Sequence, residues 1–435
     1  MGDLPTELLS AIVKDLPARD LRQLRATDRR LKEVTEQGAF RQITITNTVK
    51  SIGGLVQLLN SDRLREFVEV IDFKERPRPA ELGELRYIPP DPVASTEADE
   101  GLYQAIQTAL AQFHRFPRLN TLRLIFRKVY DIPLFQEDGY QPLNEPPPSA
   151  SIDLQRALIA GLGAFGENCG NMPVHHLAVQ NLLPYAHEAF AHPGLARLLS
   201  SLHVLEIGIN DASEEVGAYG AANLPVFYEH SLPRILRAGQ ELRELTLAPR
   251  AIYIGIEFSL NFSGLTIPHL EKVSLARVSF KETDPTGPEH FIIRHAGALR
   301  SLELIYCTIH KYEDELVIDR PWAATWNLFA EELKLLTKLR VEWEGSSGEH
   351  TQLGYCSEEP GVSWGPSNHY PIDGVEGDAA ALDAFAEIVK ARDGGEVTIL
   401  ATIPDRDSDV DEDEDENEGE DGEDGESDEE EEDSE

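Results

Sequence analysis

The feature that most constrains the fold of this 435-residue chain is a short apolar phrase that recurs along most of its length. Each copy consists of an apolar residue, two other residues, a second apolar residue, one other residue and a third apolar residue. Because side chains alternate across a strand, the last two apolar positions point to one face, so each copy predicts a short half-buried strand. The full copies are Phe40/Ile43/Ile45, Val68/Ile71/Phe73, Leu119/Leu122/Leu124, Leu202/Leu205/Ile207, Leu242/Leu245/Leu247, Leu270/Val273/Leu275, Leu299/Leu302/Leu304 and Leu336/Leu339/Val341, and a partial copy is Leu177/Val179.

The spacing of these copies separates a repeat from chance, because apolar triplets arise often in an average chain. Measured at the third apolar position, the intervals are 28, 51, 55, 28, 40, 28, 29 and 37 residues, so four of the eight equal 28 or 29. An apolar stripe with helical spacing precedes several copies, such as Leu154, Leu158 and Leu162 ahead of the copy at Leu177. A unit of one helix and one short strand cannot bury its own apolar face, so the pattern predicts units that stack on one another.

Residues 40–345 therefore resemble leucine-rich repeats, whose longer units have this length. The resemblance is irregular, because the asparagine or cysteine that the family carries three residues past the last apolar position is kept only by Asn210 and Cys307. Two Pro-rich segments, 75–93 and 140–150, fall in the longest intervals and are expected to be exposed loops. The resemblance implies a solenoid, and the alternative is an α/β domain without repeats.

The first 45 residues predict three short helices of their own. Pro5 suits a first helical turn, where its missing N–H would have no partner, and the first apolar stripe ends at Pro17. A third helix is expected to stop near Gly38. Three helices in about forty residues bury too little surface to be stable alone, so they need either the following domain or another protein. The apolar residues that define the first two helices are Leu8, Ile12, Leu16, Leu21 and Leu24.

This segment resembles an F-box, the helical module that docks substrate receptors onto cullin-type ubiquitin ligases. The resemblance implies a partner, the small adaptor protein that bridges to cullin. The alternative is a helical cap that packs only on its own chain. The matching positions are Leu4-Pro5, Glu7-Leu8, Ile12, Leu16, Asp20-Leu21, Leu24-Arg25, Arg29, Phe40 and Ile43. The resemblance places on the adaptor-binding surface Leu4, Pro5, Leu8, Ile12, Leu16, Leu21 and Leu24.

The sequence thus predicts an α/β protein in three parts: an F-box-like three-helix module at residues 1–45, an irregular leucine-rich-repeat domain at 46–404 and a tail at 405–435. A Gly/Ser/Pro-rich stretch at 345–378 is expected to be a long loop or linker, followed by one more helix and a strand at 397–400. The tail contains 22 acidic residues and one basic residue. It cannot bury enough apolar surface to offset the entropy of ordering, so we expect it to be disordered.

Charge and cysteine content limit the partners and the compartment. The net charge of −39 disfavours nucleic acids and anionic membrane surfaces, because both need local positive charge on the protein. Three widely spaced cysteines fit a reducing compartment without a disulfide framework. No apolar run is long enough for a membrane span, and no signal-peptide core is present. We expect the protein to be cytoplasmic, nuclear or both.

No motif in the chain carries enzyme chemistry. The sequence has no GxSxG, P-loop, HExxH or CxxC motif. His175 and His176 are adjacent and would point to opposite faces of a strand, which makes a poor joint metal site. Cys307 lies at a turn position of the repeat, where packing is the simpler role. We therefore expect a non-catalytic protein with no cofactor and no metal site.

The surface most suited to a target protein is the open face of the strands. Residues that alternate with the buried apolar positions project to that face, because the side-chain period of a strand is two. The row is mixed in charge and carries no ligand signature of its own. It consists of Asp72, Arg123, Glu206, Thr246, Ser274, Glu303 and Arg340.

Taken with the F-box resemblance, these patterns predict a substrate-recognition subunit of a cullin-type ubiquitin ligase whose target is an unknown protein. The first alternative is an acidic leucine-rich nuclear protein that binds histones or other basic partners through the tail. A second alternative is a GTPase-activating protein of the Ran type, which also combines repeats with an acidic tail. Neither alternative accounts for the N-terminal helices.

Overall fold

The structure is a computed structural model, and it describes the helices and strands of most of the chain. The described residues are 5–14, 16–27, 29–76, 96–127, 135–136, 139–142, 150–210, 226–249, 261–281, 286–311, 320–344, 355–357 and 377–402. The predicted tail lies outside them, as do most residues of the predicted loops at 75–93, 140–150 and 345–378.

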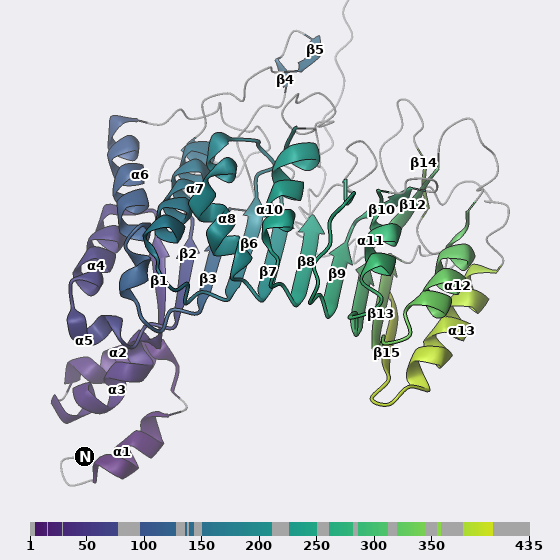
Figure 1. Cartoon of the computed structure of the whole chain (residues 1–435). Helices are drawn as coiled ribbons and strands as arrows, with labels where there is room; N and C mark the ends of the chain where they lie inside the picture. Colours follow the sequence, from purple (N-terminus) through teal and green to yellow (C-terminus); the bar gives the residue numbers. More distant parts are fainter. Residues whose placement is uncertain are drawn as a thin grey trace, which may run out of the picture.

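Ten strands form one sheet in which every pair of neighbours is parallel (Figure 1). The strands follow one another in the order of the chain, so each pairs with the strand before it and the strand after it. The predicted α/β class is confirmed. The strands are β1 (Gln42–Thr46), β2 (Val70–Lys74), β3 (Thr121–Ile125), β6 (His176–Leu182), β7 (Val204–Ile209), β8 (Glu244–Pro249), β9 (Lys272–Ala276), β11 (Ser301–Ile305), β13 (Lys338–Glu344) and β15 (Glu396–Thr402).

Helices stack in chain order along one face of this sheet (Figure 1). Parallel neighbours need a crossover between them, and these helices lie within the crossovers. The helices are α4 (Val49–Leu59), α5 (Asp62–Arg65), α6 (Glu97–Leu110), α7 (Ala150–Asn168), α8 (Pro193–Ser200), α10 (Leu232–Ala238), α11 (Pro288–Arg294), α12 (Trp322–Glu332) and α13 (Asp378–Lys390). Smaller elements are the turns η2 (Phe113–Arg115), η3 (Glu188–Ala191) and η4 (Phe227–Ser231), the hairpin of β4 (Phe135–Gln136) and β5 (Gly139–Pro142), and a small sheet of β10 (Ser279–Lys281), β12 (Thr308–Lys311) and β14 (Tyr355–Ser357).

The core lies between the helices and the sheet, and the apolar phrase supplies its sheet side. Every copy of the phrase coincides with one of the ten strands, and the strand expected at 397–400 is β15. In β11, for example, Leu302 and Leu304 are buried and alternate with half-buried residues. Burying a leucine side chain contributes about 1.5–3 kcal/mol, so the recurring phrase is the main source of cohesion between units.

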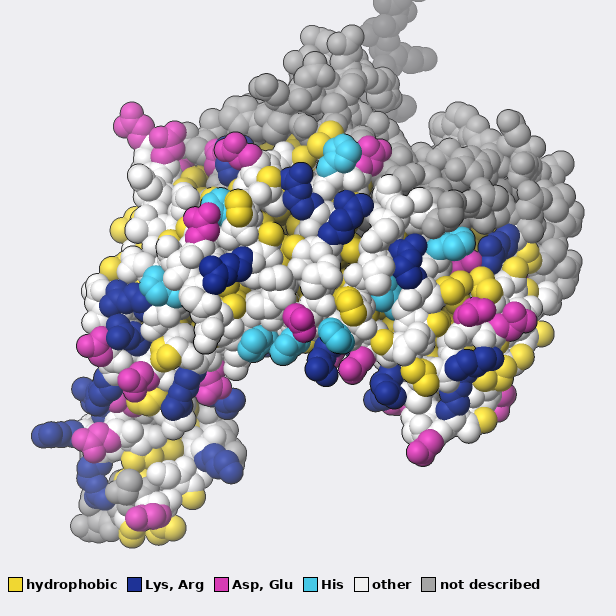
Figure 2. Space-filling model, in the orientation of Figure 1, with side chains coloured by type: hydrophobic (Ala, Val, Ile, Leu, Met, Phe, Trp, Pro, Cys, Tyr) yellow, Lys and Arg dark blue, Asp and Glu magenta, His cyan; other side chains and the backbone are white. Residues whose placement is uncertain are grey.

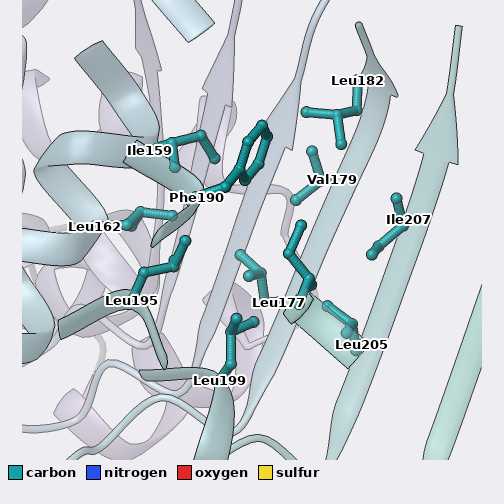
Figure 3. A pocket seen from close by; sticks show the side chains of 11 residues that line it. Ile159, Leu162, Leu177, Val179, Leu182, Phe190, Leu195, Leu199, Leu205 and Ile207 are labelled. Atoms are coloured by element: carbon teal, nitrogen blue, oxygen red, sulfur yellow. The ribbon is translucent and has the colours of Figure 1, made fainter. Parts of the chain in front are cut away.

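The interior between α7, η3, α8 and the strands β6 and β7 contains one small void (Figure 3). Its volume of about 20 Å³ holds roughly one water molecule, and its lining is entirely apolar, so it would stay dry. It is a packing defect of the core and offers no polar group to a ligand. Its lining residues are Ile159, Leu162, Leu177, Val179, Leu182, Phe190, Leu195, Leu199, Leu205, Ile207 and Ile235.

Backbone hydrogen bonds join neighbouring units at the amino edge of the sheet. At the amino edge, the carbonyl of the residue just before a strand accepts two N–H groups from the next unit: His175 O accepts from His203 N at 2.8 Å and from Val204 N at 3.0 Å. This sharing ties successive units at the start of each strand. At the other edge, chain segments outside the described residues follow the carboxyl ends of several strands, for example 211–225 after β7. The same double acceptance occurs at Glu69, Asn120, His175, His203, Arg243, Glu271 and Arg300.

Three helices precede the sheet and lie beyond the amino end of β1 (Figure 1). They are α1 (Thr6–Val13), α2 (Ala18–Thr27) and α3 (Arg29–Arg41). The expected stop at Gly38 is wrong, because α3 continues through it to Arg41, directly before β1. A Cβ at Gly38 would lie 2.7 Å from Leu21 Cδ1, so the glycine admits the side chain of α2. The predicted boundary at residue 45 falls inside β1, which pairs with β2.

A buried carboxylate joins the N-terminal helices to the first units of the sheet. The Glu36 side chain in α3 is only 4% exposed and accepts from Arg25 of α2 at 3.3 Å and from Arg63 of α5 at 2.7 Å. A buried charge is tolerated only when it is paired and hydrogen-bonded, so the two guanidinium groups account for its position. Arg22 adds a link by donating to the carbonyls of Ala39 and Gln42.

Candidate functional site

The first helix, α1, has two apolar faces that meet different surroundings. Leu9 and Val13 are buried, at 3% and 6% exposure, and hold α1 to the other N-terminal helices. Leu8 and Ile12 belong to the neighbouring stripe and are 52% and 58% exposed. Each pair is spaced by four residues, so each forms its own stripe along the helix. An eight-residue helix therefore packs one stripe on its own chain and leaves the other open.

The remaining predicted docking residues divide between surface and interior. Pro5 is exposed next to the open stripe, while Leu16 and Leu24 are partly buried. Leu21 is 4% exposed and packs in the small core formed with Val13 and Ala39, so it is not available to a partner. Sequence reasoning could not separate these roles, because all are apolar at helical spacing. The remaining docking residue of the prediction, Leu4, lies outside the described residues.

The open face of the sheet brings the predicted target-facing residues into one row. The pairing registers join Asp72 to Arg123, then pass through Ala178 to Glu206, and continue across each following strand. Two members do not project freely, because Asp72 and Ser274 are each only 5% exposed. The row in order is Asp72, Arg123, Ala178, Glu206, Thr246, Ser274, Glu303 and Arg340.

Charges on this face are neutralised between neighbouring strands. Arg123 lies 3.4 Å from Asp72, and Lys272 lies 2.9 Å from Glu303. His176 contacts Glu206 at 3.1 Å, and this hydrogen bond lowers the pKa of the Glu206 carboxyl. Because these cations face carboxylates, much of the charge on this face is neutralised, which suits a broad protein surface better than a small charged ligand.

A strained pair of one aromatic and one cationic residue lies at the carboxyl side of this face. No sequence motif predicted this pair. Arg277 and Tyr306 have φ of 51° and 52°, a left-handed conformation that is uncommon for such residues. Both lie two residues past the last apolar position of their phrase, as does Asn181, with φ of 57°. The Arg277 guanidinium lies 5.7 Å from the Tyr306 ring centre, and the Tyr306 hydroxyl donates to Glu342 at 3.1 Å. The sequence signal that could have revealed this conformation is that all three residues occupy the same position of the repeat.

The histidines and cysteines that could suggest chemistry have structural partners. The His175 ring stacks on that of His203 with 4.6 Å between ring centres. Cys307 is buried, and burial raises the pKa of its thiol to about 12, which makes it a poor nucleophile. Within the described part of the chain, no group of three His, Cys, Asp or Glu side chains could hold a metal ion. Asn210, three residues past the last apolar position of its phrase, is also buried.

No known protein-family model matches this sequence, and no curated protein matches it significantly. None of the helices in the described ranges is long and apolar enough to cross a membrane.

Proposed function

We propose that this protein is a substrate-recognition subunit of a cullin-type ubiquitin ligase and that its N-terminal helices dock onto the ligase adaptor. The observation that carries the proposal is the open stripe of α1, where Leu8 and Ile12 are more than half exposed beside a buried second stripe. Exposed aliphatic side chains in a row on a helix favour docking into a groove of a partner. The resemblance of this segment to an F-box is the reason for proposing the ligase adaptor as the partner.

The anchoring of the N-terminal helices supports the same role. A docking module can hold a target near a ligase only if its orientation to the target-binding domain is fixed. Glu36, with Arg25 and Arg63, joins the docking helices to the first units of the sheet. The open strand face would then hold the target, and ubiquitin transfer would follow from proximity, without catalytic groups on this chain.

The exposed area of the open stripe sets the affinity that it can contribute. Full burial of a leucine or isoleucine side chain contributes about 1.5–3 kcal/mol, and about half of each side chain is still exposed on α1. Removing both would therefore cost about 2 kcal/mol of binding free energy, or about a 30-fold rise in Kd.

Two matched double variants of the full-length chain test this proposal. L8A/I12A truncates the open stripe, and L335A/I388A truncates two aliphatic side chains of similar exposure at the far end of the sheet, 42% and 43%. Binding to the purified adaptor is measured by calorimetry. We expect L8A/I12A to weaken binding about 30-fold, because the buried area of the complex shrinks, and L335A/I388A to leave it unchanged. If the unmodified chain does not bind the adaptor, the proposal is wrong.

A second candidate, binding of histones or other basic proteins, is supported by the 22 acidic residues at 405–435. It is separated from the first by deleting that segment. Loss of histone binding together with retained adaptor binding would assign the two partners to different ends of the chain.

A further inference from the structure

The N-terminal end of the protein is positively charged, although the chain as a whole is strongly acidic. Residues 16–66, which include α2 to α5, contain ten Lys and Arg against six Asp and Glu, a net charge of +4. The segment 405–435 carries −21, and the rest of the chain carries −22. We call the surface of residues 16–66 the basic cap. Lys and Arg side chains gather at this end of the molecule in Figure 2.

Several cations of the basic cap have no carboxylate partner among the described residues. Arg19, Arg29, Lys32 and Lys50 are exposed and form no ion pair with a described residue. Arg22 donates to two backbone carbonyls, which leave its positive charge uncompensated. The positive charge of the cap is therefore available at its surface.

Its own carboxylates do not cancel this charge. Glu36 is buried between Arg25 and Arg63, and Asp62 lies 2.9 Å from Arg65. Arg41, at the end of α3, is paired with Glu69 at 2.7 Å. Three other carboxylates of the cap, on Asp20, Glu33 and Glu66, form no ion pair with a described residue, but the unpaired cations outnumber them.

We propose that the acidic segment 405–435 of the same chain binds the basic cap. Complementary charge is the first argument, because the segment holds by far the densest negative charge in the sequence. Reach is the second. The ten strands span nine spacings of about 4.8 Å, or roughly 43 Å from β15 to β1. The 33 residues after Thr402 can extend to roughly 110 Å at 3.3–3.6 Å per residue.

Covalent attachment raises the local concentration of the segment at the cap, so weak surface contacts suffice. Individual exposed ion pairs contribute little, but several of them on one segment act together. The bound segment lies next to α1 and would compete with any acidic partner of the N-terminal helices. The contact does not depend on the proposed function.

Zero-length carbodiimide cross-linking of the full-length chain tests the contact, because it joins lysine amines to carboxylates that touch them. We expect cross-links from 405–435 to Lys32 and Lys50 of the basic cap. A segment that stayed near β15 would instead reach lysines on the elements that contact this strand, namely Lys338 in β13 and Lys390 in α13. Mixing ¹⁵N-labelled and unlabelled protein distinguishes cross-links within one chain from those between chains.

Charge-reversal variants provide the matched control. R19E/R29E removes two cations of the cap, and R197E/R234E makes the same change of charge on α8 and α10. The cap cross-links should fall several-fold in R19E/R29E and persist in R197E/R234E. They should also fall several-fold as salt rises from about 0.1 M to about 1 M, since the Debye length drops from about 10 Å to about 3 Å. Cross-links confined to Lys338 and Lys390, or found only between chains, would overturn the proposal.

Discussion

Replacing Gly166 by alanine should destabilise the protein, because α7 and α8 touch backbone to backbone at this position. A Cβ on Gly166 would lie 1.9 Å from the carbonyl oxygen of Gly194 in α8, and a Cβ on Gly194 would lie 1.9 Å from the carbonyl oxygen of Gly163. Ordinary contact for a Cβ begins near 3.4 Å, so the two helices would have to separate by about 1.5 Å. Neither side can yield by rotating a side chain, because backbone faces backbone.

The size of the effect follows from two opposing contributions. Overpacking typically costs 1–3 kcal/mol, and the upper end, about 3 kcal/mol, applies because both neighbours are backbone. Alanine is favoured over glycine in a helix by about 1 kcal/mol, which offsets part of that cost. The G166A variant should therefore lose about 2 kcal/mol of unfolding free energy.

The same substitution on α4 is the control, since a Cβ at Gly53 would meet no atom within 4 Å. G53A should keep only the helix-propensity gain and stabilise the protein by about 0.5–1 kcal/mol. Urea denaturation followed by circular dichroism measures both variants against the parent chain. If G166A is as stable as G53A, then α7 and α8 do not approach each other this closely, and the cost assigned to their backbone contact is wrong.

Two further outcomes concern α1 and a half-buried histidine. Leu9→Ala should cost about 3 kcal/mol by leaving a cavity, while Leu8→Ala, half exposed, should cost under about 1 kcal/mol; amide exchange of α1 distinguishes them. Burial, with a smaller contribution from Arg156, lowers the pKa of His187 to about 4 from 6.5. The folded state therefore resists protonation, so stability present above pH 6.5 is lost as pH falls towards 4, by about 3 kcal/mol at most. His187→Phe, which keeps the stack on Phe190, should flatten this loss in denaturation measured at pH 7 and pH 4.5.

The strands were predictable because their signal is local and repeated. Each phrase carries its own alternation of apolar residues, and burial of pairs such as Leu245 and Leu247 follows from that alternation. The row on the open face was predictable for the same reason. Once the buried positions are aligned, residues such as Thr246 and Glu303 must share a register. The burial of individual residues in this row, such as that of Ser274, depends on the neighbouring strands. The local sequence pattern therefore does not predict it.

The docking helix was predictable only in part. The apolar residues of α1 form two overlapping stripes, and only the packing of α1 on α3 decides that Leu9 and Val13 face inward. Gly38 does not end a helix as its residue type suggests, because its role depends on Leu21, a residue distant in sequence. In both cases the deciding contact is tertiary, and local propensity gives no information about it.

The doubly shared carbonyls at the amino edge fix where each strand starts relative to the strand before it. Inserting a residue between His203 and Val204 would break a bond pair to His175 and shift the alternation of the whole following strand. Differences in unit length are therefore accommodated outside these junctions, and the intervals of 51 and 55 residues show that units of unequal length occur. Reporter domains or epitope tags inserted after the carboxyl end of a strand, for instance within 211–225, should leave the order of units intact. Single units of the protein could then be labelled one at a time.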